Sequence, residues 1–200
     1  KKSEFNSELP TIFHKILDKP MIKKIVDNFV TLGFDDITTV VKSDAEELVD
    51  LLANTCKYTK AEDDISDFKA LSPLLEDKEG ITVLTYGNIP LITEDTYSEL
   101  VSEVAEHPMV VLTADRLSPK QARILRNPAE TIREIVKYED ATLDQRSIKE
   151  VNMNIYAFDN KLLYKYLKEL DETKVNYSAK DVVAKFKEYG HTVYPHKVKD

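Results

Sequence analysis

Short runs of apolar residues alternate along the chain with longer segments in which apolar residues recur every three or four positions. The runs have the length of strands, and the longer segments have the period of amphipathic helices. This alternation predicts an α/β fold in which a mostly parallel sheet is covered by helices on both faces. Strands are expected at residues 37–41, 81–85, 110–113, 123–125, 132–137 and 151–158.

Several predicted helices have recognisable ends. Pro20 stands at the start of a helix over residues 21–32, and Gly33 is placed to end it. Thr93 is placed to begin another helix, and Asp44 to cap a shorter one. Further elements are expected at residues 161–170 and 178–189, as helices, and at residues 191–198, as an edge strand.

The chain has no Pro-rich, Gly-rich or Ser-rich linker. Its 200 residues, 42% of them hydrophobic, are enough to bury one sizeable core. Residues 115–151 have a weaker helical period, and we expect them to form a small β-rich lobe attached to the sheet. The prediction is therefore a single domain over residues 1–200.

Charge and composition narrow the function classes. Lys and Arg number 28 against 36 Asp and Glu, so the net charge is −8, which disfavours nucleic acid as a partner. No apolar run approaches the roughly 20 residues that cross a bilayer, so no membrane association is expected. Cys56 is the only cysteine and cannot form an internal disulfide. The cytoplasm is the expected location.

Common cofactor and metal motifs are not found. The four glycines are scattered, which excludes a dinucleotide-binding or phosphate-binding loop among these residues. The four histidines lack metal-ligand spacing, and Cys56 has no nearby histidine. The acidic residues between 62 and 67 have no calcium-loop spacing, so a solvated loop is the favoured interpretation.

A set of dispersed segments resembles one protein family. In chain order they are Ser7-Glu8-Leu9-Pro10, His14-Lys15, Lys19-Pro20-Met21, Tyr86-Gly87-Asn88-Ile89-Pro90-Leu91-Ile92-Thr93, Glu139-Asp140-Ala141-Thr142, Gln145-Arg146, Ile148, Glu150-Val151-Asn152 and Ile155-Tyr156. Their order and spacing are similar, from end to end, to the uridylyltransferase domain of the bifunctional N-acetylglucosamine-1-phosphate uridylyltransferase/glucosamine-1-phosphate acetyltransferase family.

The resemblance implies a Rossmann-like nucleotidyltransferase fold. It also implies transfer of a uridylyl group from UTP to a sugar 1-phosphate, with Mg²⁺ and loss of pyrophosphate. The substrate-binding residues that it implies are Tyr86, Gly87, Asn88, Arg123 and Asn152. The family's N-terminal strand and Gly-rich loop would precede Lys1, and its acetyltransferase β-helix is not in this chain.

The chain departs from the family pattern at the phosphate and metal positions. The family's phosphate-loop arginine aligns with Glu4, its second phosphate lysine with Thr11, and its metal-binding aspartate with Asn88. Two positive groups and one carboxylate ligand are thereby lost. One misplaced charge at ~4 Å is worth about 4 kcal/mol at an effective dielectric constant of ~20. No intact catalytic residue and no metal site are therefore expected.

The residues aligned with the family's base-binding and sugar-binding positions also differ from the family pattern. The segment that would read the base, residues 60–69, lacks both family glycines and contains Ile65 and Phe68. On the sugar side the family's glutamate aligns with Lys137 and a nearby lysine with Glu139, which is an exchange of charges.

These departures favour a catalytically degenerate domain that acts as a binding or assembly module, with a sugar nucleotide or a protein as partner and no cofactor. One alternative is an active sugar-1-phosphate uridylyltransferase that makes UDP-N-acetylglucosamine with Mg²⁺, and another is a ligand binder of modest affinity. A purely structural interpretation also stays open, in which the retained residues hold turns and the sheet. These residues are Leu9, Pro10, Pro20, Pro90, Asn152 and Tyr156.

Overall fold

The computed structural model describes residues 11–41, 46–52, 55–62, 64–116 and 120–198 of the 200-residue chain. It divides into two compact units. The first unit comprises Lys1–Asp64 and Thr85–Ser98, and the second comprises Ile65–Leu84 and Glu99–Asp200.

The first unit is built around one amphipathic helix, α1 (Met21–Thr31), and a pair of parallel strands, β3 (Thr38–Val41) and β4 (Lys57–Lys60). Its other elements are a 3-10 turn at Thr11–Phe13, the antiparallel hairpin of β1 (Lys15–Ile16) and β2 (Lys19–Pro20), and the helix α2 (Glu46–Leu52). Buried residues of α1 pack against buried residues of α2 in one hydrophobic cluster that contains Ile22, Val26, Leu48 and Leu52.

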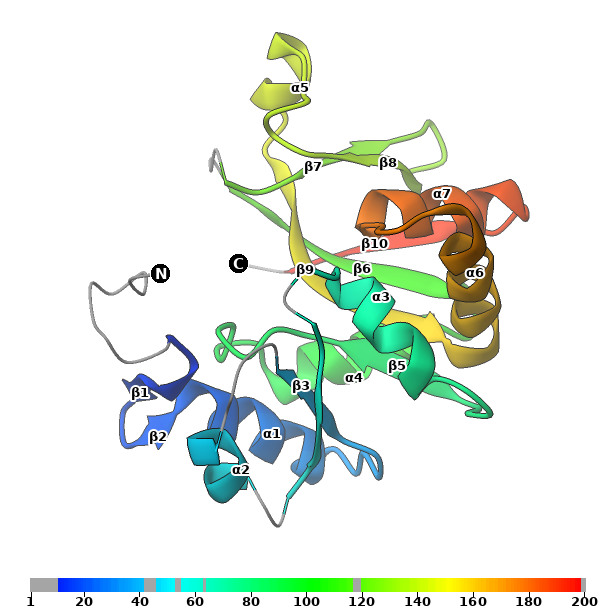
Figure 1. Ribbon diagram of the computed structural model, residues 1–200. Coiled ribbons are helices and arrows are strands. Elements are labelled where there is room, and N and C mark those ends of the chain that lie inside the picture. The colour runs from blue at the N-terminus through cyan, green and yellow to red at the C-terminus, as the bar shows by residue number, and fades with distance from the viewer. Residues whose placement is uncertain (1–10, 42–45, 53–54, 63, 117–119, 199–200) are drawn as a thin grey trace. The chain divides into compact units, whose positions relative to one another are not determined.

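The second unit contains a six-stranded sheet in the order β10-β6-β9-β7-β8, with β5 paired to β9 (Figure 1). The strands are β5 (Ile81–Leu84), β6 (Met109–Asp115), β7 (Arg123–Arg126), β8 (Ile132–Val136), β9 (Glu150–Asp159) and β10 (Val193–Lys197). The helices are α3 (Asp67–Leu71), α5 (Leu143–Ser147), α6 (Asn160–Thr173) and α7 (Ala179–Glu188). Helix α4 (Glu94–Glu103) runs from the first unit into the second.

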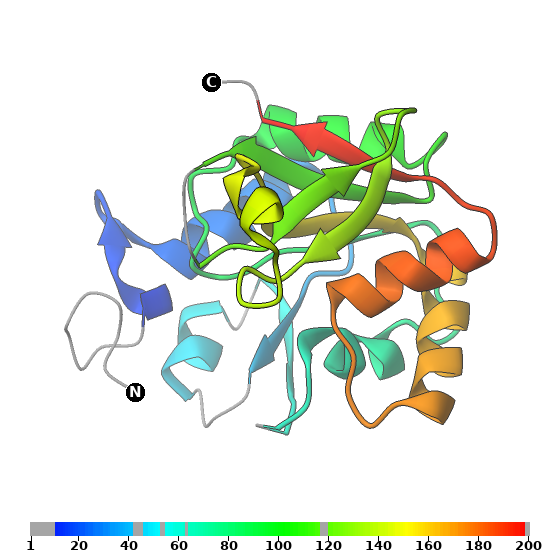
Figure 2. The ribbon, with the colours of Figure 1, turned by 90° about the horizontal axis from the view of Figure 1, so that it is seen from above.

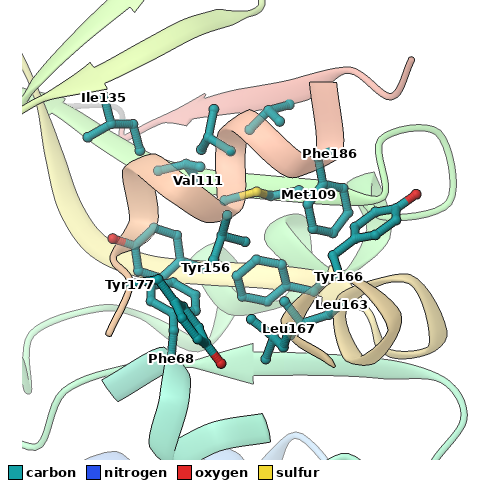
Figure 3. Packing of buried hydrophobic residues seen from close by; sticks show 14 of the residues in the cluster. Phe68, Met109, Val111, Ile135, Tyr156, Leu163, Tyr166, Leu167, Tyr177 and Phe186 are labelled. Carbon is teal, nitrogen blue, oxygen red and sulfur yellow. The ribbon is translucent and has the colours of Figure 1, made fainter. Parts of the chain in front are cut away.

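Helices pack on both faces of this sheet. On one face α3, α6 and α7 bury aromatic and aliphatic side chains against β6 and β9, as Figures 1 and 2 show for the helices and Figure 3 for the side chains. Val193 of β10 belongs to that core. His196 is three positions further along the strand, so its side chain lies on the other face, where it contacts Glu99 and Glu103. The second half of α4 therefore lies on the opposite face.

Most element ends follow the predicted signals. The Thr93 hydroxyl accepts a hydrogen bond from the Thr96 backbone N–H at 3.2 Å, so it caps α4 as expected. Gly33 and Gly190 both have a φ of +79° just after their helices, which is the left-handed conformation that glycine adopts without strain. Asp44 lies outside the described residues.

The α/β class is confirmed, but the prediction of a mostly parallel sheet is wrong for the described sheet of the second unit. β5, β6 and β7 all run antiparallel to β9, and the only parallel pair in that sheet is β10 with β6. β9 is buried at seven of its ten positions. A strand covered on both faces is a continuous apolar run whatever its direction, so the hydrophobic pattern could not give the direction.

One smaller expectation is confirmed, and one element was not expected. The β-rich lobe over residues 115–151 is the hairpin of β7 and β8 with α5, and it joins the main sheet through the register pair of Arg123 with Val151. Strand β4 was not expected, because lysines stand at both ends of a strand that is largely exposed. None of the described helices has the length and apolar character that crossing a bilayer requires.

Candidate functional site

The predicted residues Tyr86, Gly87 and Asn88 form a turn that follows β5 along the chain. The Ile89 N–H donates to the Tyr86 carbonyl at 3.2 Å, which places Gly87 and Asn88 at its two central positions. A Cβ atom on Gly87 would lie only 3.0 Å from Ile22 Cδ1 and 3.1 Å from a methyl of Ile12. Glycine is needed here for close packing, while Asn88 is exposed to solvent.

These residues do not fit a dedicated Mg²⁺ site. Asn88 offers one neutral amide oxygen, whereas Mg²⁺ is usually held by one or two carboxylates together with substrate phosphates. Within the described ranges no three His, Cys, Asp or Glu side chains converge as metal ligands. Thr11 is neutral and opens the 3-10 turn of the first unit, and Glu4 lies outside the described residues.

Asn152 lies at a bulge in β9. Val111 of β6 is in register with Tyr156, and Thr113 with Asn152, so three residues of β9 face the single residue between them on β6. The middle of these three, Asn154, has a φ of +58°, a left-handed conformation that asparagine tolerates better than most residues. The bulge brings the side chains of Asn152, Asn154 and Tyr156 together.

These three side chains form a closed hydrogen-bond network. Asn152 Nδ2 donates to the Tyr156 hydroxyl at 2.7 Å and to Asn154 Oδ1 at 3.0 Å, which uses both of its protons. Asn152 Oδ1 accepts from the Asn154 N–H at 2.9 Å, and the Tyr156 hydroxyl donates to Asn154 Oδ1 at 3.2 Å. Burial is the main cause that raises the pKa of Tyr156, so its hydroxyl keeps its proton.

Asn152 is also buried, with 2% of its surface exposed. Phe68 of α3 packs on the Tyr156 ring with a centroid distance of 5.4 Å. Phe68 belongs to the segment of residues 60–69, and Ser66 of the same segment caps α3 by accepting from the Lys69 N–H. Part of the segment that the resemblance assigns to base recognition therefore has another role: Ser66 caps α3, and Phe68 packs in the core.

Arg123, on β7, is likewise 2% exposed. Its Nη1 donates to the Gln121 carbonyl at 3.1 Å and its Nε to the Arg146 carbonyl at 3.4 Å. Its guanidinium carbon lies 5.0 Å from the centre of the Tyr138 ring, and that of Arg146 lies at the same distance. Arg123 thus holds α5 and the residues before it against β7.

The structure brings two of the predicted residues together. The Asn152 N–H donates to the Ala122 carbonyl at 2.9 Å, so Arg123 and Asn152 are neighbours within the second unit. Tyr86, Gly87 and Asn88 belong to the first unit. Lys137 and Glu139 are both exposed.

The sequence analysis did not identify the side chains that contact Asn152 and Arg123. The spacing of two residues between Asn152, Asn154 and Tyr156 would place all three on one face of a regular strand. The sequence therefore contained a signal for part of the network. Tyr138 and Arg146 had none, because their contact with Arg123 depends on how the hairpin and α5 fold.

Comparison with known proteins identifies relatives of the whole chain. It is 32% identical over 199 residues to the bifunctional protein GlmU of Brevibacillus brevis, which covers 96% of this chain and 43% of that protein. It is 31% identical over 208 residues to the bifunctional protein GlmU of Lactobacillus helveticus, covering 100% of this chain and 45% of the relative. The chain thus spans less than half the length of these relatives. No protein-family profile matches it.

Solved structures agree on the fold. A putative glucose-1-phosphate thymidylyltransferase from Bacillus anthracis, in complex with a sucrose, has a TM-score of 0.74 at 15% identity, over 98% of this chain and 81% of its own. A CMP:2-keto-3-deoxy-manno-octonic acid synthetase complexed with CTP has a TM-score of 0.68 at 14% identity, over 96% and 85%. The predicted nucleotidyltransferase-like fold and the relation to GlmU are confirmed.

Proposed function

Because the chain is a nucleotidyltransferase-like relative of the GlmU proteins, we propose that it keeps their fold without sugar-nucleotide synthesis and serves as a binding or assembly module. The closed network around Asn152 is the observation that carries the proposal. Both amide protons of Asn152 already have partners within the chain, so a sugar ligand could be bound there only after the network opened.

The burial of Arg123 supports the same proposal. A guanidinium that binds a sugar phosphate must offer its N–H groups to the ligand, and that of Arg123 is used on two backbone carbonyls beside Tyr138. Phosphoryl transfer relies on positive groups and a metal that neutralise the phosphates. Thr11 and Asn88 are neutral at positions where the family resemblance implies a cation and a metal ligand.

The direct test is pyrophosphate release from UTP and N-acetylglucosamine 1-phosphate in the presence of Mg²⁺. We expect none above a blank without protein, while pyrophosphate added to the same mixture reports that detection works. Turnover within about a hundredfold of a typical kcat of ~10 per second would overturn the proposal.

Thermal unfolding then separates the kinds of ligand. At ~100 times its Kd a ligand adds about 2.7 kcal/mol to the free energy of unfolding. We expect UTP with Mg²⁺ to leave the Tm unchanged, because the phosphate-binding charges are lost. A rise with UDP-N-acetylglucosamine but without turnover would make a sugar nucleotide the ligand of the module.

An active sugar-1-phosphate uridylyltransferase is the second candidate. It is favoured by the about 30% identity to proteins named GlmU along nearly the whole chain. Asn88→Asp separates the two candidates, because it returns a carboxylate to the turn. We expect it to give no turnover alone, and none together with Glu4→Arg and Thr11→Lys, since Asn152 and Arg123 stay engaged. Activity of Asn88→Asp alone would mean that the phosphate site is intact.

A further inference from the structure

A pocket in the first unit is lined by none of the predicted substrate-binding residues. It has a volume of about 340 Å³ and lies between α2 and the strand pair β3–β4. Its lining residues are Thr39, Leu48, Val49, Leu52, Cys56, Lys57 and Tyr58. Small-molecule sites have volumes of about 300 to 1,000 Å³, mostly apolar walls and a few polar groups.

The wall and the mouth of the pocket differ in chemistry. Leu48 and Leu52 are 1% and 3% exposed and belong to the core cluster, so one wall is the apolar face of α2. The side chain of Lys57 is 74% exposed and pairs with Asp36 at 3.2 Å, and Tyr58 is 58% exposed. Lys57 and Tyr58 therefore lie at the mouth of the pocket, in contact with solvent.

Two polar side chains lie together in the lining. The Thr39 hydroxyl and the Cys56 thiol are 3.4 Å apart, and either can donate to the other. A thiol is a weak hydrogen-bond partner. A ligand oxygen or nitrogen would therefore compete well for the Thr39 hydroxyl, and the remainder of the ligand would contact leucine and valine side chains.

We propose that this pocket binds a small, mainly apolar ring compound that carries one hydrogen-bonding group directed at Thr39. An apolar cavity of about 150 Å³ holds benzene, so the volume here has room for a bicyclic compound. The lining contains one cation that is already paired, so an uncharged ligand fits it better than a charged one. The inference does not depend on the proposed function, because none of the seven lining residues belongs to the predicted substrate site.

Indole is a suitable probe, because it is bicyclic, uncharged and has one N–H donor. Cys56 is the only cysteine of the chain, so its alkylation by N-ethylmaleimide reports on this pocket alone. We expect indole at two to three times its Kd to slow that alkylation about threefold, as mass action requires. We expect 1-methylindole, which has no N–H, to bind several times more weakly.

Variants of α2 give the matched control. Val49→Phe places a ring in the pocket and should abolish protection by indole. Glu47→Phe places the same ring on an exposed position of the same helix and should leave protection unchanged. Thr39→Val keeps the volume and should remove the difference between indole and 1-methylindole.

Three results would overturn the proposal. These are alkylation of the wild-type chain at the same rate with and without indole, protection that persists in Val49→Phe, or protection lost equally in Glu47→Phe. Should Val49→Phe fail to fold, shown by loss of its unfolding transition, Thr39→Val decides alone: an unchanged preference for indole in that variant refutes the assigned contact.

Discussion

Asn88 and Asn152 are the same residue type, and the family resemblance places both at the substrate site. The two side chains nevertheless differ in exposure and in hydrogen bonding. Asn88 is exposed to solvent at a central position of a turn. Asn152 is 2% exposed and has every hydrogen-bonding group of its amide engaged within β9.

The comparison separates two reasons for a family residue to be retained. A residue that the fold needs is retained whether or not the chain carries out the chemistry of its relatives, and Asn152 is such a residue. A residue that serves only a ligand has no such protection, and at Asn88 the carboxylate implied by the resemblance has been replaced. Arg123 belongs with Asn152, and Gly87 does too, because it packs closely against Ile22.

The largest effect is expected at Arg123. Arg123→Ala removes a buried side chain from the Tyr138 ring and leaves the Gln121 carbonyl without its donor, so we expect a loss of about 3 kcal/mol in the free energy of unfolding. Arg133→Ala, at an exposed arginine of the neighbouring strand β8, should change it by less than about 0.5 kcal/mol. Denaturant unfolding measures both, and equal effects would show that Arg123 is not structural.

Asn152 and Asn88 can be compared directly by the same substitution. Asn152→Ala leaves the buried Tyr156 hydroxyl without a donor and should cost about 2 kcal/mol, while Asn88→Ala should change stability by less than about 0.5 kcal/mol. Combined with Tyr156→Phe, the Asn152→Ala change should cost at least about 0.5 kcal/mol less than the sum of the two. Strict additivity would contradict the closed network.

The sequence predicted helix ends well because each end is a local event. Thr93 and Gly33 act through hydrogen bonds and dihedral angles within a few residues, so their types alone carry the information. Strand direction is different, because it depends on which strand is the neighbour. The buried residues of β6 and β9 have the same apolar pattern in parallel or antiparallel pairing.

The candidate site, too, was predictable from the sequence only in part. Residue types and their order indicated a relation to the GlmU proteins, and the comparison with known proteins confirms that relation. The burial of Arg123 was not predictable, because Tyr138 and Arg146 approach it only once the hairpin of β7 and β8 has formed. The closure of the network around Asn152 depends on the bulge in β9, which no periodic pattern indicates.

Gly87 gives a smaller test of the turn. Gly87→Ala would place a methyl 3.0 Å from Ile22 Cδ1, and we expect a loss of about 1 kcal/mol in the free energy of unfolding from overpacking. Ile22→Val removes that Cδ1 atom, so Gly87→Ala should cost less in the Ile22→Val background than in the wild type. The same cost in both backgrounds would show that the contact with Ile22 is not its source, because the contact with the Ile12 methyl at 3.1 Å remains in both.

The smallest expected effect tests whether the backbone itself builds the bulge around Asn152. Asn154→Gly and Asn154→Ala both remove the side-chain amide, so they differ only in a Cβ at a φ of +58°. A Cβ in this left-handed region costs about 1 kcal/mol, so the glycine variant should be the more stable of the two by about that amount.

At Arg133, an exposed position of the regular strand β8, the order should reverse, because glycine in a strand costs about 0.5 to 1 kcal/mol relative to alanine. The four variants are compared by denaturant unfolding at one pH. If alanine were the better residue at both positions, the left-handed conformation of Asn154 would not be part of the folded state in solution. The network that occupies Asn152 would then lose its geometric basis, and Asn152 would become as available to a ligand as Asn88.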